Sequence, residues 1–150
     1  ACGYFKAAKK FFRPEDFHQN DIVYVARSLN LESKQFAPEH YVQSTRQWHQ
    51  DIILEFYGYR RFDKNALKTL EQEILFMIRS QLKPKLIFWC CIDILIRERI
   101  QIPPYFQLSE LILKAGNQRK KELIAVIRCQ LSVETKSLLD GLFTQEKEIP

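Results

Sequence analysis

The residues best suited to chemistry in this sequence are basic and hydroxyl side chains grouped where helices are expected to begin. Ser44-Thr45-Arg46-Gln47 is the clearest group. The free backbone N–H groups of a first helical turn bind phosphate, and Arg and Gln side chains can hydrogen-bond to base edges. Lys83-Pro84-Lys85 precedes another expected helix and can hold a phosphate in a similar way. Both groups indicate a nucleic-acid contact of the helix-turn-helix kind.

Four further clusters of basic residues occur along the chain. They are Lys6/Lys9/Lys10, Arg60-Arg61, Arg97 with Arg99, and Arg119-Lys120-Lys121. Each cluster alone is most simply explained as a solvated surface. Together they favour another interpretation, in which folding brings them into one continuous electropositive ridge that exposes helix amino termini. Double-stranded DNA, with its regular rows of phosphates, would bind such a ridge.

Side chains for catalysis or metal binding do not occur at useful spacings. The sequence has no Gly-x-Ser-x-Gly, no glycine-rich phosphate loop and no His-Glu-x-x-His. His18, His40 and His49 are not spaced to share a helical face, and His49 and Asp51 would point in different directions on a helix. We therefore expect no catalytic residue, metal site, cofactor or small-molecule substrate, and we do not expect the chain to be an enzyme.

The composition favours a helical globular protein of the cytoplasm. The 150 residues include only 4 Gly and 6 Pro, fewer turn residues than all-β folds usually need. The net charge of +5 permits a nucleic acid or an acidic membrane as partner. The longest wholly apolar run, Leu86–Ile92, is far below the roughly 20 residues of a spanning helix, so no membrane partner is expected. The 4 cysteines lack a Cys-x-x-Cys pair and are expected to be reduced and buried.

Apolar periodicity predicts six or seven helices and no strand, which defines an all-α bundle with helix-turn-helix-like units. Tyr4–Phe12 is interpreted as the tail of a helix, and a short last helix is expected to begin after a cap at Ser132. Gly116-Asn117 is expected to kink or split the long penultimate helix. The other expected helices are Arg13–Asn30, Ser44–Tyr57, Lys64–Gln81, Leu86–Arg99 and Gln107–Gln130.

Caps and apolar faces complete this outline. Ser44 or Thr45 is expected to cap one helix and Asp63 the next, and Gly58 is expected to end a helix in the left-handed conformation. Ten of the eleven residues Leu86–Ile96 are apolar, which predicts a helix buried on most sides. Two other inward faces are expected at Trp48, Ile52, Ile53 and Phe56, and at Leu108, Leu111, Ile112, Ala115, Leu123, Val126 and Ile127.

Asp93 interrupts the most apolar helix and is expected to form an ion pair with Arg97 or Lys85. Residues 1–143 are interpreted as helical. The sequence leaves open whether they form one bundle or two small units, about 1–62 and 63–143. Residues 144–150 are interpreted as a tail or linker, and the chain is expected to be a piece of a longer protein.

The order of several segments resembles the N-terminal domain of bacterial replicative transposases of the Tn-three type. The resemblance covers nearly all of Gly3–Phe143. It is carried by Gly3-Tyr4-Phe5-Lys6, Phe11-Phe12, Ser44-Thr45-Arg46, Ile52-Ile53-Leu54, Gly58-Tyr59-Arg60, Phe62, Arg97–Arg99, Ile100-Gln101-Ile102-Pro103, Leu108, Ile112, Ala115, Leu131, Leu138-Leu139-Asp140 and Leu142.

The resemblance implies an all-helical, non-catalytic region that grips the terminal inverted repeats of a transposon. The metal-binding nuclease of that family lies far downstream, outside these residues. The implied partners are double-stranded DNA at the transposon ends, the downstream catalytic region of the same protein, and a second copy in a homodimer. The implied DNA contacts are Ser44, Thr45, Arg46, Gln47, Arg60, Lys83, Lys85, Arg97, Arg99, Arg119 and Lys120.

An alternative function is a helical interaction module through which transposase copies associate with each other. The modest net charge of +5 and the 13% aromatic content motivate this alternative. Association that is insensitive to salt, without duplex binding, would favour it over DNA recognition.

Overall fold

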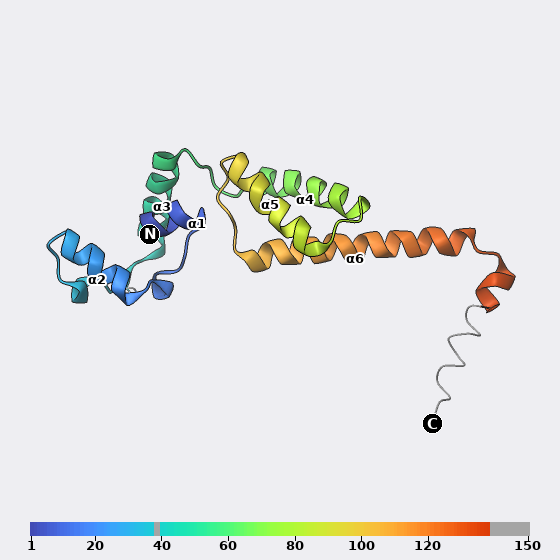
Figure 1. Cartoon of the computed structure of the whole chain (residues 1–150), viewed down its shortest axis with the longest axis horizontal. Helices are drawn as coiled ribbons and strands as arrows, with labels where there is room; N and C mark the ends of the chain where they lie inside the picture. The colour runs from blue at the N-terminus through green and yellow to red at the C-terminus, as the bar shows by residue number, and fades with distance from the viewer. Residues whose placement is uncertain (38–39, 139–150) are drawn as a thin grey trace, which may run out of the picture.

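The computed structural model describes residues 1–37 and 40–138, and this part of the chain is all-α, as predicted (Figure 1). Two 3-10 turns, η1 (Pro14–Asp16) and η2 (Ser33–Gln35), flank the second helix, and residues 133–138 are again helical. The expected apolar positions Leu139, Leu142 and Phe143 and the tail 144–150 lie outside the described residues. The main helices are α1 (Cys2–Ala8), α2 (Gln19–Ser28), α3 (Gln43–Tyr57), α4 (Lys64–Arg79), α5 (Pro84–Arg97) and α6 (Tyr105–Gln130).

Helices α4, α5 and the first half of α6 pack around the main core. Buried residues recur at helical spacing on α4, as the 3.6-residue period requires for one inward face. The least exposed of them, Ile74, is 0% exposed. The core residues are Ala66, Leu70, Ile74, Met77, Ile87, Cys91, Ile92, Leu95, Ile100, Ile102, Leu108 and Ile112.

A smaller aromatic centre joins α1 to α3. Phe5 is fully buried, and its ring centroid lies 4.7 Å from Phe11, 5.8 Å from Tyr57 and 5.4 Å from Tyr59. Aromatic pairs at these separations gain about 0.5–1.5 kcal/mol beyond their burial. Phe5 therefore fixes α1 against the end of α3.

Backbone hydrogen bonds tie these two parts together near the end of α3. Arg60 N–H donates to the Arg99 carbonyl at 2.8 Å, and Gln101 N–H donates to the Arg60 carbonyl at 2.9 Å. Ile102 N–H donates to the Lys9 carbonyl at 2.9 Å. Three segments distant in sequence are thus held side by side.

The helix ends confirm three predicted caps and correct a fourth. The Ser132 hydroxyl oxygen accepts the Thr135 N–H at 3.2 Å, where the helix at 133–138 begins. The Asp63 carboxylate accepts the Ala66 N–H at 2.8 Å, and Gly58 ends α3 with φ 66°. Ser44 and Thr45 were the wrong caps, because α3 begins one residue earlier with Val42 at the capping position. Their hydroxyl groups therefore belong to residues inside the first turn.

The segment after Arg13 forms a 3-10 turn rather than the start of a long helix. Asp16 accepts the Arg13 N–H at 3.3 Å, which closes the turn locally, and Phe17 is extended with φ −75° and ψ 131°. Because Phe17 leaves the helical conformation, α2 begins only at Gln19.

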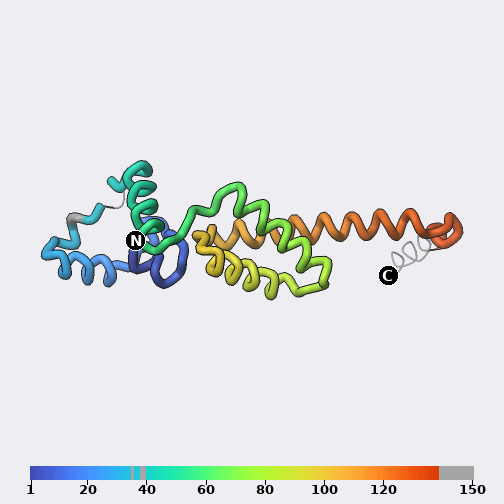
Figure 2. Tube along the Cα trace, turned by 90° about the horizontal axis from the view of Figure 1, so that it is seen from above, coloured from blue at the N-terminus to red at the C-terminus, as the bar shows by residue number. Residues whose placement is uncertain are grey.

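Helix α6 is continuous, without the kink or split expected at Gly116-Asn117. Its second half extends beyond α4 and α5 (Figure 2). Leu123, Val126 and Ile127 were expected to face inward and are instead exposed, because α4 and α5 do not reach them.

Exposed apolar side chains correct two more predicted faces. Trp48, Ile52 and Phe56 on α3 are exposed rather than inward, with Phe56 at 77%. Helix α5 is covered by α4 and α6 on one side, which leaves Leu86 and Trp89 exposed, so this helix is not buried on most sides. No other element in the described part of the chain packs against the face of α3 or α5 that carries these exposed side chains.

Asp93 and the cysteines also differ from expectation. Asp93 is exposed to water, and among the described residues no ion pair joins it to Arg97 or Lys85. Of the cysteines, Cys91 is fully buried while Cys2 and Cys129 are exposed. Burial raises the pKa of the Cys91 thiol to about 12. In residues 1–37 and 40–138 no helix is long and apolar enough to cross a membrane.

Candidate nucleic-acid interface

Four basic residues from three segments gather where the chain passes from α3 to α4. Lys9 and Lys10 follow α1, Arg60 follows α3, and Arg99 follows α5. The backbone hydrogen bonds of Arg60 to Arg99 and of Ile102 to Lys9 bring these segments together. We call Lys9, Lys10, Arg60 and Arg99 the junction cluster. These residues lie between positions 9 and 99 of the sequence, and folding concentrates their positive charges at one place.

Aromatic rings hold three of these cations in place. Lys9 Nζ lies 6.0 Å from the Tyr57 ring centroid and 5.9 Å from that of Tyr59. The guanidinium carbon of Arg99 lies 5.7 Å from the Tyr59 centroid. Lys10 Nζ lies 3.8 Å from the Tyr105 centroid. Such contacts are worth about 0.5–1 kcal/mol at exposed sites and position a cation without neutralising it.

Carboxylates neutralise the junction cluster only in part. Arg60 lies 3.8 Å from Asp63, with both side chains about half exposed. Arg61, its neighbour, is held by Asp51 at 2.8 Å and by the Gln47 carbonyl at 3.1 Å. Within the described residues no salt bridge reaches Lys9, Lys10 or Arg99. The cluster therefore keeps at least three positive charges for a ligand.

Lys9 and Arg99 also share an unusual backbone conformation. Their φ values are 55° and 53°, in the left-handed region that non-glycine residues seldom adopt. Both residues end or follow a helix, where the negative end of the helix dipole favours a cation. Lys9 Nζ additionally donates to the Lys6 carbonyl.

The structure brings two of the predicted contact residues together, Arg60 and Arg99. Arg97 ends α5 and lies 3.3 Å from Glu98. Lys83 and Lys85 lie at the opposite end of α5 and are exposed. The distance between the two ends of this 14-residue helix is about 20 Å.

The remaining predicted residues lie at two other places. Ser44 and Gln47 are exposed in the first turns of α3, whereas Thr45 and Arg46 are half-buried. Arg119 and Lys120 lie on the second half of α6, and Arg119 is 3.6 Å from Glu122. The predicted contacts therefore form separate groups instead of one continuous ridge, because the first turns of α3 and α5 lie a full helix length away from the junction where these two helices end.

The contacts predicted from the sequence do not include Lys9, Lys10 or the tyrosines. Lys9 and Lys10 belong only to one of the basic clusters in the sequence. The sequence signal that could have found them is the interleaving of basic and aromatic residues in Lys9-Lys10-Phe11-Phe12 and Tyr57-Gly58-Tyr59-Arg60. Such interleaving is typical of nucleic-acid-binding surfaces.

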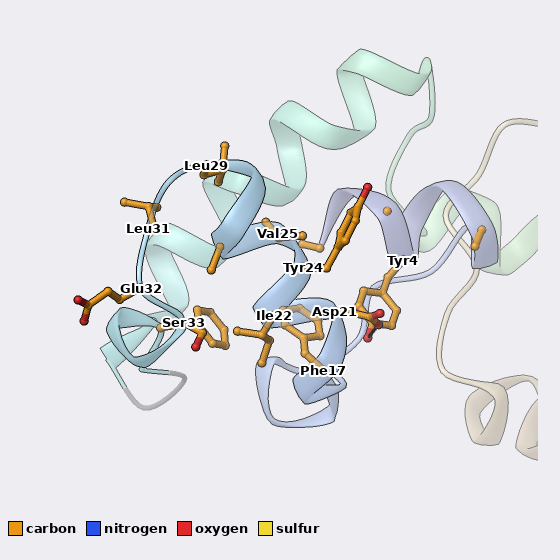
Figure 3. A pocket seen from close by; sticks show the side chains of 15 residues that line it. Tyr4, Phe17, Asp21, Ile22, Tyr24, Val25, Leu29, Leu31, Glu32 and Ser33 are labelled. Atoms are coloured by element: carbon orange, nitrogen blue, oxygen red, sulfur yellow. Dashed lines mark hydrogen bonds between the residues drawn. The ribbon is translucent and has the colours of Figure 1, made fainter.

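A groove that the sequence did not predict lies between α1, α2 and η2 (Figure 3). Its volume is about 810 Å³, and its lining is mainly apolar. At one end the Tyr4 hydroxyl donates to the Asp21 carboxylate and accepts the His18 N–H at 3.0 Å. The hydrogen bond to Asp21 raises the pKa of the Tyr4 phenol. We call this feature the α2 groove.

The described side chains offer no arrangement typical of catalysis or metal binding. His49 contacts the Tyr41 hydroxyl, while the Asp51 carboxylate binds Arg61, so His49 and Asp51 do not form an acid–base pair. In residues 1–37 and 40–138 no three His, Cys, Asp or Glu side chains gather around a possible metal position.

The fold and the junction cluster thus define a small all-α protein with a basic, aromatic-lined surface. Residues 1–115 match a protein family described as "Domain of unknown function (DUF4158)". The chain belongs to this family. The matched region contains the whole junction cluster and the α2 groove but not Arg119 and Lys120. No curated protein matches the chain.

Proposed function

We propose that this chain binds double-stranded DNA and that the junction cluster contacts the phosphate backbone. The observation that carries the proposal is the convergence of Lys9, Lys10, Arg60 and Arg99 from three segments, with three of them unneutralised by carboxylates among the described residues. Phosphate contacts from lysine and arginine supply most of the affinity in protein–DNA complexes.

The first turn of α3 supplies the sequence-reading part of this proposal. Arg46 and Gln47 can hydrogen-bond to base edges, and the exposed Ser44 hydroxyl can bond to a phosphate. Helix α3 separates this turn from the junction cluster by 15 residues, about 22 Å. That distance corresponds to about six base pairs at the 3.4 Å rise of a duplex. One duplex can therefore reach both ends of α3.

The resemblance to Tn-three-type transposases gives the proposed DNA target. The chain would hold the terminal inverted repeats while a downstream nuclease region of the same protein cuts and joins strands. No catalytic step is assigned to these residues, and the chain acts as a DNA-binding part rather than as an enzyme. The segments that carry the resemblance lie largely within the matched residues 1–115.

A fluorescence-anisotropy titration with a transposon-end duplex and a scrambled duplex tests the proposal. We expect Lys10→Gln to weaken binding to both duplexes by the same factor, because phosphates are alike in every sequence. Arg46→Ala should weaken the end duplex more than the scrambled one, by about 1–3 kcal/mol of lost discrimination.

Lys114→Gln is the matched control, since this exposed lysine on α6 lies outside the junction cluster. It should leave both affinities nearly unchanged. If wild-type protein binds neither duplex, or if Lys114→Gln weakens binding as much as Lys10→Gln does, DNA binding through the junction cluster is wrong.

A further inference from the structure

The second half of α6 is an amphipathic helix with no partner in the described part of the chain. We call residues Gly116–Gln130 the α6 tail. Leu123, Ile124, Val126 and Ile127 are 44%, 40%, 52% and 52% exposed. The tail carries four basic residues against one acidic residue, Glu122. It is therefore an exposed apolar strip bordered by positive charge.

The α2 groove has complementary properties at the other end of the molecule. Its apolar lining includes the exposed side chains of Val25, Leu29 and Leu31. The charged side chains that line the groove are Asp21, in the first turn of α2, and Glu32, after the end of α2 (Figure 3). Arg27 and Lys34 line a smaller hollow that shares Glu32 with the groove. A volume of about 810 Å³ provides room for apolar side chains from a docked helix.

We propose that the α6 tail of one copy docks into the α2 groove of a second copy of this chain. Apolar side chains of the tail would enter the groove, and its lysines and arginines would lie near Asp21 and Glu32. This arrangement is the helix-in-groove mode of recognition, in which an apolar face supplies affinity and rim charges supply orientation. The two tails of a pair carry the same positive net charge, and their repulsion disfavours the alternative in which the tails pair with each other.

The groove of the same copy is out of reach of its own tail. Figures 1 and 2 place α2 at one end of the molecule and the α6 tail at the other. Helix α6 is a single 26-residue helix, about 39 Å long, so it cannot fold back without breaking. Each copy carries one tail and one groove, and two antiparallel copies can occupy each other's groove around a two-fold axis.

Sedimentation equilibrium of the whole chain without DNA tests this contact. We expect a reversible dimer for wild type. Ile127→Asp in the tail and Leu29→Asp in the groove should each raise the Kd of self-association at least about tenfold, because each places a carboxylate in an apolar contact. Phe106→Asp is the matched control at a 67% exposed site outside both surfaces, and it should leave the Kd unchanged.

Mixing the two variants distinguishes this contact from other modes of pairing. Ile127→Asp keeps an intact groove and Leu29→Asp keeps an intact tail, so an equimolar mixture can form one native contact per pair. We expect the mixture to associate more tightly than either variant alone and more weakly than wild type. A monomeric wild type, or a mixture no tighter than the variants, overturns the proposal. The proposal is also overturned if Ile127→Asp dissociates the dimer and Leu29→Asp does not, because that result assigns the contact to paired tails. None of these outcomes depends on DNA binding.

Discussion

The salt dependence of DNA affinity gives the sharpest quantitative prediction for the junction cluster. Replacing Lys9, Lys10 and Arg99 with Gln removes the three cations that no described carboxylate neutralises. Each phosphate contact contributes about 0.9 to the slope of log K against log salt, so the triple variant should lose about 2.7 from that slope. A fourfold rise in salt should then weaken wild-type binding about 40-fold more than it weakens the variant.

Anisotropy titrations of one duplex at several salt concentrations measure this slope directly. The matched control is a triple variant at Lys64, Lys68 and Lys114, three exposed lysines outside the junction cluster. The control has the same net charge as the test variant, so a nonspecific effect of charge would reduce both slopes equally. Equal slopes for the two variants, or a test variant with the wild-type slope, would show that the junction cluster does not contact the phosphates.

Three further predictions concern stability, charge and thiol chemistry. Ile74→Ala should lower the free energy of unfolding by about 2–5 kcal/mol in urea denaturation, because Ile74 is fully buried in the core. Asp63→Asn should keep the cap of α4 with little change in stability and should tighten DNA binding, since it removes the carboxylate beside Arg60. Cys91 should resist alkylation in the native protein while Cys129 reacts, because burial raises the pKa of the Cys91 thiol from 9.0 to about 12.

The elevated pKa of Cys91 also fixes the sign of a pH effect. Above its ordinary value of 9.0 the unfolded thiol ionises while the folded one stays protonated, so stability falls as pH rises from 9.0 towards about 12. The variant Cys91→Ser is not expected to show this loss of stability with rising pH. A stability that rises over this window, or rapid alkylation of native Cys91, would contradict the assignment. An unchanged unfolding midpoint for Ile74→Ala would contradict the stability prediction. Weaker DNA binding by Asp63→Asn would contradict the prediction for the carboxylate beside Arg60.

Local sequence rules predicted the helices well where one mechanism determines the outcome. Asp63 caps α4 because its carboxylate accepts a free N–H, and Gly58 ends α3 because it tolerates a positive φ. The apolar period also predicted the helix Lys64–Gln81, and Leu70 and Ile74 of that helix lie in the core. Ala66 is buried as well, but a small side chain contributes little to such a pattern.

Tertiary arrangement explains most of what the sequence could not provide. Amphipathic spacing shows that one face of a helix is apolar, but not which element covers it. Phe56 and Ile127 were expected inward and are exposed for this reason. The junction cluster depends on the backbone hydrogen bond from Arg60 to Arg99, 39 residues apart in the sequence, which no local pattern encodes.

A backbone-amide NMR titration with a duplex locates the DNA-contacting surface of the protein without any substitution. We predict that the largest chemical-shift changes fall on the segments around Lys9-Lys10, Arg60 and Arg99, with a second group at the first turn of α3. Changes confined to the α2 groove or to the α6 tail, or no changes on adding duplex, would contradict this prediction.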